Sequence, residues 1–190
     1  MVDFSADIRT CVTALAAGDT ILYPTDTVWG IGCDATSERA VEKVFALKQR
    51  PKEKSMIVLL PEARDVLQFV AAPPPDIISI IEGFERPTTV VFDGALGLAA
   101  NAINEDGSIA LRVPQDAFCK ALLKRFGKPI ISTSANLSGA SAAAFFAQID
   151  PAIKAGAGYV VSYRQDDMTP ARPSRILRVD EGGNFIVLRD

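Results

Sequence analysis

The sequence of 190 residues contains no histidine. This absence excludes the Ser-His-Asp and Cys-His catalytic arrangements, and it removes the commonest metal ligand and the commonest general base near neutral pH. Any chemistry of this chain must therefore rely on charge, on the positioning of substrates and on a metal ion that arrives with a substrate.

Cysteine is scarce as well, with Cys11, Cys33 and Cys119 far apart in the chain. A disulfide framework or a zinc knuckle needs closer or paired spacings, so we expect three reduced thiols. No run of 18 or more apolar residues is present, and residues 1–7 lack the basic and apolar regions of a secretory signal. We therefore expect a cytoplasmic protein without a membrane span.

The chain also lacks an excess of positive charge, since 20 basic and 23 acidic residues give a net charge of -3. Bulk charge does not indicate a strongly basic nucleic-acid binder, although a local basic patch remains open. Hydrophobic residues make up 48% of the chain, which is enough for one sizeable core and argues against two ordinary domains.

Strand and helix patterns alternate along the chain. A helix is predicted to begin after Thr36 or Ser37 and to stop near Arg50, because Pro51 disfavours a helical residue before it. The fold class expected is one mixed α/β domain over residues 1–190, a twisted sheet with flanking helices. Further helices are predicted at 61–70, 75–84, 116–126 and 141–155, and strands at 20–23, 56–60, 88–92, 108–113, 129–132, 158–163, 175–179 and 185–189.

Three short segments carry side chains suited to chemistry. Residues 23–32 offer two hydroxyls, a carboxylate and two glycines after a strand, which suit either a small zwitterionic ligand or an ordinary turn. Residues 48–54 hold four cations, which suit either a phosphate or carboxylate site or a solvated loop after a helix. Residues 132–139 hold four hydroxyls and an amide, which suit either a phosphate cradle or a helix N-cap.

Taken together and in order, these segments are far more specific than each alone. The chain reads Tyr-Pro-Thr-Asp-Thr-Val-Trp-Gly at 23–30, Lys-Gln-Arg-Pro at 48–51, Pro-Thr-Thr at 87–89, Arg-Val-Pro at 112–114, Ser-Thr-Ser-Ala-Asn-Leu-Ser-Gly at 132–139 and Pro-Ser at 173–174. From about residue 20 to 189 it resembles the YrdC-like family of threonylcarbamoyl-AMP synthases and their relatives. The resemblance implies the short, single-domain kind of member, with a concave basic cleft.

The resemblance also implies an activity. Such an enzyme is a nucleotidyltransferase that forms threonylcarbamoyl-AMP and pyrophosphate from L-threonine, bicarbonate and ATP, for the threonylcarbamoyladenosine modification of tRNA. Mg²⁺ would arrive bound to ATP, and no dedicated metal site is expected. Its partners would be tRNA-modifying transferase proteins, with weak RNA binding. Two alternatives stay open: a double-stranded RNA-binding or ribosome-associated module without this catalysis, and a paralogue that acts on a different carbamate or is inactive.

Site residues follow from the family's motifs, position by position. The Lys-x-Arg and Ser-x-Asn pairs are expected to face each other across the cleft, with Ala135 packed against the body of the protein. The resemblance implies catalytic roles for Lys48 and Arg50, threonine contacts for Thr27, Arg112, Ser134 and Ser174, and ATP contacts for Arg50, Lys54, Asn136 and Arg189.

Overall fold

The structure is a computed structural model that describes residues 3–49, 56–180 and 182–190. Its centre is one mixed sheet of nine strands, in the order β7-β1-β2-β6-β3-β5-β4-β8-β9. The pairs β7–β1, β3–β5 and β4–β8 are parallel, and the other neighbours are antiparallel. The strands are β1 (Ile21–Tyr23), β2 (Gly30–Asp34), β3 (Ile57–Leu59), β4 (Thr88–Phe92), β5 (Ile109–Arg112), β6 (Ile130–Ser134), β7 (Tyr159–Val160), β8 (Arg175–Val179) and β9 (Phe185–Arg189).

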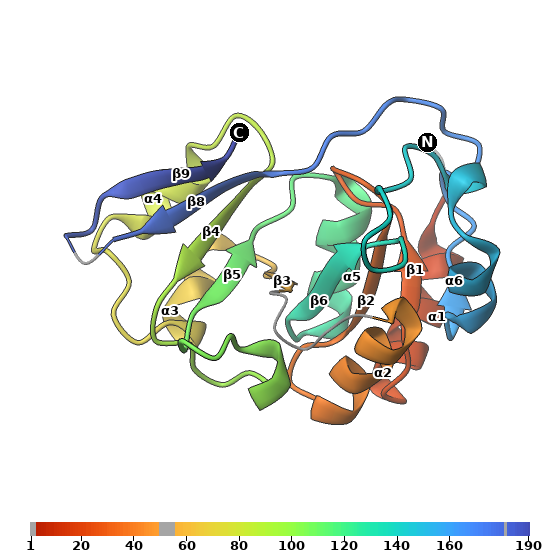
Figure 1. The fold of residues 1–190 in the computed structure, drawn as a ribbon, viewed down its shortest axis with the longest axis horizontal. Helices are drawn as coiled ribbons and strands as arrows, with labels where there is room; N and C mark the ends of the chain where they lie inside the picture. The colour runs from red at the N-terminus through yellow and green to blue at the C-terminus, as the bar shows by residue number, and fades with distance from the viewer. Residues whose placement is uncertain (1–2, 50–55, 181) are drawn as a thin grey trace.

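Helices flank this sheet, which confirms the predicted α/β class. Figure 1 shows α1, α2 and α6 gathered at the β1–β2 end and α3 and α4 at the β4 end. In the same view, the segment between β7 and β8 crosses over the top of the molecule from one end to the other. The helices are α1 (Ser5–Ala16), α2 (Glu38–Lys48), α3 (Val66–Phe69), α4 (Ile77–Glu82), α5 (Ala117–Phe126) and α6 (Pro151–Gly156).

Two helices have the ends that the sequence predicts. The Ser37 side chain accepts a hydrogen bond from the Ala40 amide at 3.3 Å at the start of α2. At the start of α5, Asp116 accepts one from the Cys119 amide at 3.0 Å. Gly127 ends α5 with φ of 73°, a left-handed conformation that favours glycine.

Other segments differ from the expectation. The predicted helix over 141–155 is wrong for most of its length, since α6 begins only at Pro151, after Asp150 accepts from the Ala152 amide at 2.8 Å. Residues 61–70 form a 3₁₀ turn followed by the single turn α3, and the strand expected at 158–163 is the two-residue β7. Neither α1 nor β2 was predicted.

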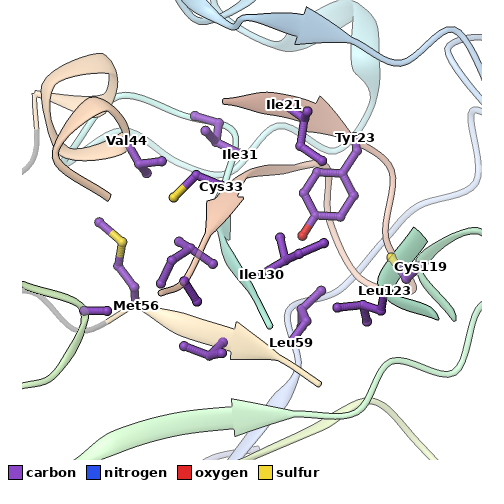
Figure 2. Close-up of a cluster of buried hydrophobic side chains, with 14 of the residues drawn as sticks. Ile21, Tyr23, Ile31, Cys33, Val44, Met56, Leu59, Cys119, Leu123 and Ile130 are labelled. Carbon is purple, nitrogen blue, oxygen red and sulfur yellow. The ribbon is translucent and has the colours of Figure 1, made fainter. Parts of the chain in front are cut away.

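The core lies where the sheet meets the helices. Figure 2 shows Val44 of α2 near Ile31 and Cys33 of β2, and Leu123 of α5 on the side of Tyr23, Leu59 and Ile130. All three cysteines are free thiols, and all three are buried. Among the described residues, no helix combines the length and apolar character needed to cross a bilayer.

Candidate functional site

A cavity of about 350 Å³ opens over the middle of the sheet. Its floor is one sheet face, because the strand register joins Gly30 to Ser134, Ile57 to both Ser132 and Ala110, and Ala110 to Val91. Residues two apart on a strand point to the same side, so Arg112 shares this face with Ala110. The polar lining consists of Thr27, Arg112, Ser132, Thr133, Ser134, Ser174 and Arg189.

The small size of several floor residues creates this space. A Cβ atom added at Gly30 would lie 3.1 Å from the Ser132 Oγ, so a larger residue would crowd the floor. The apolar part of the lining includes Ile57, Val91, Ala110, Ile176 and Leu188. The cavity thus joins an apolar region to hydroxyls and two guanidinium groups.

Arg112 is a buried positive charge in the cavity. Its side chain is 4% exposed, its Nη1 donates to the Thr27 Oγ1 at 3.1 Å, and its Nη2 lies 3.5 Å from the Asp26 Oδ1. Its Nε is buried and has no hydrogen-bond partner among the residues that the structure describes. A buried donor without a partner is costly, so the guanidinium of Arg112 is suited to pair with an anionic ligand.

The turn from Thr25 to Val28 fixes the partners of Arg112. The Thr25 Oγ1 donates to the Val28 carbonyl at 2.8 Å and accepts from the Thr27 amide at 3.0 Å. Since Thr25 has already given its proton, the 2.9 Å bond between the two hydroxyls is donated by Thr27. The Thr27 oxygen is then left to accept, from Arg112 and from a ligand.

Asp26 completes this arrangement from the other side of the turn. Its Oδ2 accepts from the Gln115 amide at 2.8 Å, and the Gln115 side chain donates to the Phe84 carbonyl at 2.7 Å. The carboxylate is therefore anchored to the segment that follows β5, and it orients the guanidinium of Arg112.

A second guanidinium, that of Arg189, belongs to the same cavity. Its Nε and Nη2 donate to the Ser174 carbonyl at 3.2 and 2.8 Å, while the Ser174 hydroxyl pairs with the Thr89 hydroxyl at 2.8 Å. Burial, and then the charge of Arg112, lower the pKa of Arg189. Two guanidinium groups that repel each other in this way favour an anion bound beside them.

Lys48 does not line the cavity, and the expectation that it faces the cleft is wrong. Its side chain is fully buried, and its ammonium donates to the Ser134 carbonyl and, at 2.7 Å, to the Asn136 carbonyl. The Ser138 amide in turn donates to the Lys48 carbonyl at 2.9 Å. Lys48 therefore lies beneath the loop and holds its backbone in place.

The two residues of the Ser-x-Asn pair differ in their position relative to the cavity. Ser134 lines the cavity, and Ala135 is buried against the body of the protein, as predicted. Asn136 instead donates to the carbonyls of Leu137 and Ala140 at 2.9 and 2.7 Å, so it closes its own loop and does not face the cavity. Arg50 and Lys54 lie outside the described residues.

Sequence reasoning therefore found five of the cavity residues, namely Thr27, Arg112, Ser134, Ser174 and Arg189. It gave no role to Asp26 and Thr89, although both stand inside motifs that it singled out. Thr89 and Arg112 are register partners on β4 and β5, a pairing that exists only once the sheet has formed.

Comparisons with known proteins identify the family of this chain. The family model Sua5/YciO/YrdC, described as telomere recombination, matches residues 13–190. The chain belongs to this family. Threonylcarbamoyl-AMP synthase from Pseudoalteromonas translucida (strain TAC 125) is 35% identical over 157 residues, which cover 81% of this chain and 84% of that protein. The protein of the same name from Xanthomonas campestris pv. campestris (strain B100) is 30% identical over 187 residues, 97% of each chain.

A solved structure shows the same fold. Sua5 from P. abyssi, complexed with L-threonine, matches with a TM-score of 0.86 and 20% identity, over 100% of this chain and 55% of that chain. This chain therefore spans little more than half the length of that Sua5.

Proposed function

We propose that this protein is a threonylcarbamoyl-AMP synthase, a nucleotidyltransferase that converts L-threonine, bicarbonate and ATP into threonylcarbamoyl-AMP and pyrophosphate. The observation that carries the proposal is the buried guanidinium of Arg112, oriented by Thr27 and Asp26, in a cavity that also contains Arg189. Bacterial relatives with the name of this synthase, at 30% and 35% identity, support the same assignment.

Threonine binding is assigned to the Arg112 end of the cavity. The guanidinium of Arg112, which lines the cavity, would donate to the amino-acid carboxylate. The hydroxyls of Thr27 and Ser134 would meet the ammonium and hydroxyl of the same substrate, and Ser174 would contact it while holding Arg189.

ATP is assigned to the remainder of the site. Arg189, Arg50 and Lys54 are the proposed phosphate contacts, while Asn136 would act by shaping the loop after β6. Mg²⁺ is proposed to enter with ATP and to neutralise its phosphates. Within the described ranges, no group of three or more His, Cys, Asp or Glu side chains is placed to hold a metal ion.

The proposed reaction has two steps. The threonine amine takes up CO₂ derived from bicarbonate and becomes a carbamate. A carbamate oxygen then attacks the α-phosphorus of ATP, and the bond to the β-phosphate oxygen breaks, so that pyrophosphate leaves. This chemistry needs positioning and charge compensation rather than a protein nucleophile. We further propose that tRNA-modifying transferase proteins consume the product.

Pyrophosphate release in the presence of ATP, Mg²⁺, bicarbonate and single amino acids tests this function. Threonine should give the fastest release, and serine, which lacks one methyl group, should be slower by about fivefold to tenfold. Ser134→Ala should reduce turnover with little change in melting temperature. Equal release without any amino acid would refute the proposal, and tight duplex RNA binding without turnover would favour the RNA-module alternative.

A further inference from the structure

A second hollow, a groove of about 590 Å³, adjoins the cavity. Arg189 and Pro173 line both spaces, so these two residues form the boundary between the groove and the cavity described above. One wall is the end of the segment that crosses from β7 to β8, over residues 170–173. Its charged lining consists of Arg86, Arg172, Arg175, Arg189, Asp26 and Asp190.

The charge of this groove is opposite to that of the chain. Four arginines against two aspartates leave an excess of two positive charges, on a protein whose net charge is -3. The charge of Asp26 is already directed at Arg112, 3.5 Å away. The groove therefore attracts anions although the protein as a whole does not.

An oxyanion from the chain itself lies on two of these arginines. The Asp190 carboxylate contacts the Arg86 Nη2, and the same oxygen lies 3.5 Å from the Arg175 Nε. The Arg175 Nε has no hydrogen-bond partner among the described residues, so this carboxylate satisfies it poorly. The Asp190 side chain is 71% exposed, so an anion from the solvent can compete with it for this position.

Arg172 contributes a further guanidinium to the groove. It is exposed and makes no hydrogen bond or ion pair with any other residue that the structure describes. Pro173 follows Arg172 directly and Pro170 lies two residues before it, so the backbone of this wall is restricted. Planar guanidinium groups that converge on one space match the oxygens of phosphate groups better than a single carboxylate does.

We propose that this groove binds small phosphate-class oxyanions, and that the Asp190 carboxylate competes with them. Pyrophosphate has several charged oxygens and would engage Arg86, Arg172 and Arg175 together. That pyrophosphate is the natural occupant, on its way out of the cavity, rests on the proposed function. The binding site itself does not depend on it.

Isothermal titration of the full chain with inorganic pyrophosphate, without ATP or threonine, tests the site. Arg172→Ala removes a side chain that lines the groove alone, and it should weaken binding about threefold to tenfold. Asp190→Asn removes the competitor and should strengthen binding about twofold to fivefold. Ser134→Ala, which alters the cavity alone, and Arg64→Ala, an exposed arginine elsewhere, should bind as the wild type does.

Two results would overturn the proposal. Binding that is unchanged in Arg172→Ala but weakened in Ser134→Ala would place pyrophosphate in the cavity. If Asp190→Asn leaves the affinity for pyrophosphate unchanged and lowers the melting temperature, the aspartate stabilises the fold and does not compete with the anion. Orthophosphate, titrated in parallel, should bind more weakly than pyrophosphate if several arginines act together. Turnover with threonine is measured separately, so failure of the proposed function is distinguished from failure of the groove.

Discussion

Replacing Lys48 with methionine tests whether this lysine acts on the substrate or on the loop. The ammonium is fully buried and donates to the carbonyls of Ser134, at the end of β6, and of Asn136, in the loop that follows. Hydrogen bonds from a charged donor contribute about 1.5–3 kcal/mol each, which gives about 3–6 kcal/mol for the two. Methionine avoids the cost of burying a charge, so we expect a net loss of about 2–4 kcal/mol.

A loss of this size is measurable as a change in thermal unfolding. In a chain of this length each kcal/mol lowers the melting temperature by about 2–4 °C, so Lys48→Met should melt about 5–15 °C below the wild type. Lys43→Met is the matched control on the same helix, because Lys43 is 39% exposed and pairs with Asp19. This control should change stability by about 1 kcal/mol or less.

The same variants are then assayed for pyrophosphate release at a temperature where both are folded. If Lys48 holds the loop, Lys48→Met should bind threonine more weakly, because Ser134 shifts with the backbone that the lysine fixed. If Lys48→Met melts within about 2 °C of the wild type and yet has a strongly reduced kcat, Lys48 takes part directly in the chemistry.

Arg112→Lys keeps the positive charge but loses the planar guanidinium with its paired donors. The KM for threonine should therefore rise about tenfold to a hundredfold. An unchanged KM would show that Arg112 does not bind threonine. Burial raises the pKa of the thiols of Cys33 and Cys119 and raises that of Cys11 to about 12. Thiol reagents should therefore label the native protein at least about a hundredfold more slowly than the denatured chain, as followed by mass spectrometry, and fast native labelling would contradict this burial. Burial opposes the charge of Asp34, but hydrogen bonds from a lysine and a threonine outweigh it and hold the pKa of this carboxyl below its ordinary 3.8. Such a group stabilises the fold above its unfolded pKa and ceases to do so as the pH falls through its folded pKa. Asp34→Asn should therefore lower the free energy of unfolding by about 1–3 kcal/mol at pH 7, and by progressively less below about pH 4, as measured by thermal unfolding. A difference that stays constant with pH would refute the assignment.

Local chemistry predicted the ends of helices better than it predicted strand β2. Ser37, Asp116 and Gly127 gave correct boundaries because each satisfies backbone groups at its own helix end. Gly32 was placed in a segment suited to either a ligand contact or a turn, yet a Cβ there would lie 2.7 Å from the Ile131 carbonyl oxygen. Glycine serves in β2 because the neighbouring strand approaches closely, and a sequence without its partner strand does not reveal that need.

Two helices were misjudged for opposite reasons. Phe4 occupies the capping position of α1 and offers no polar side chain, and the Ser5 amide is satisfied by Asp3, one residue before the usual capping position. Residues 141–155 are rich in alanine, which favours a helix, but a short helix in water depends on an apolar face that packs against the core. That requirement is met in α6, where Ile153 is fully buried.

Site membership was more predictable than the direction of each side chain. The motifs brought Thr27, Arg112 and Ser134 to one cavity, because a strand end fixes where its residues lie. The spacing of Lys48 could not show that its ammonium turns beneath the loop, because two carbonyls 86 and 88 residues further along the chain become its acceptors. Contacts of this kind exist only after the chain has folded.

The absence of histidine determines how the cavity acts. Among its described residues the polar groups are hydroxyls and two guanidinium groups, and arginine does not release its proton in proteins. When the threonine amine becomes a carbamate, its protons must therefore pass to water or to a base derived from the substrates, such as bicarbonate. The protein is left to supply orientation and fixed positive charge, and both lower a barrier most when they are in place before the substrate arrives. Arg112 meets this condition, since Thr27 and Asp26 already hold it in the free protein.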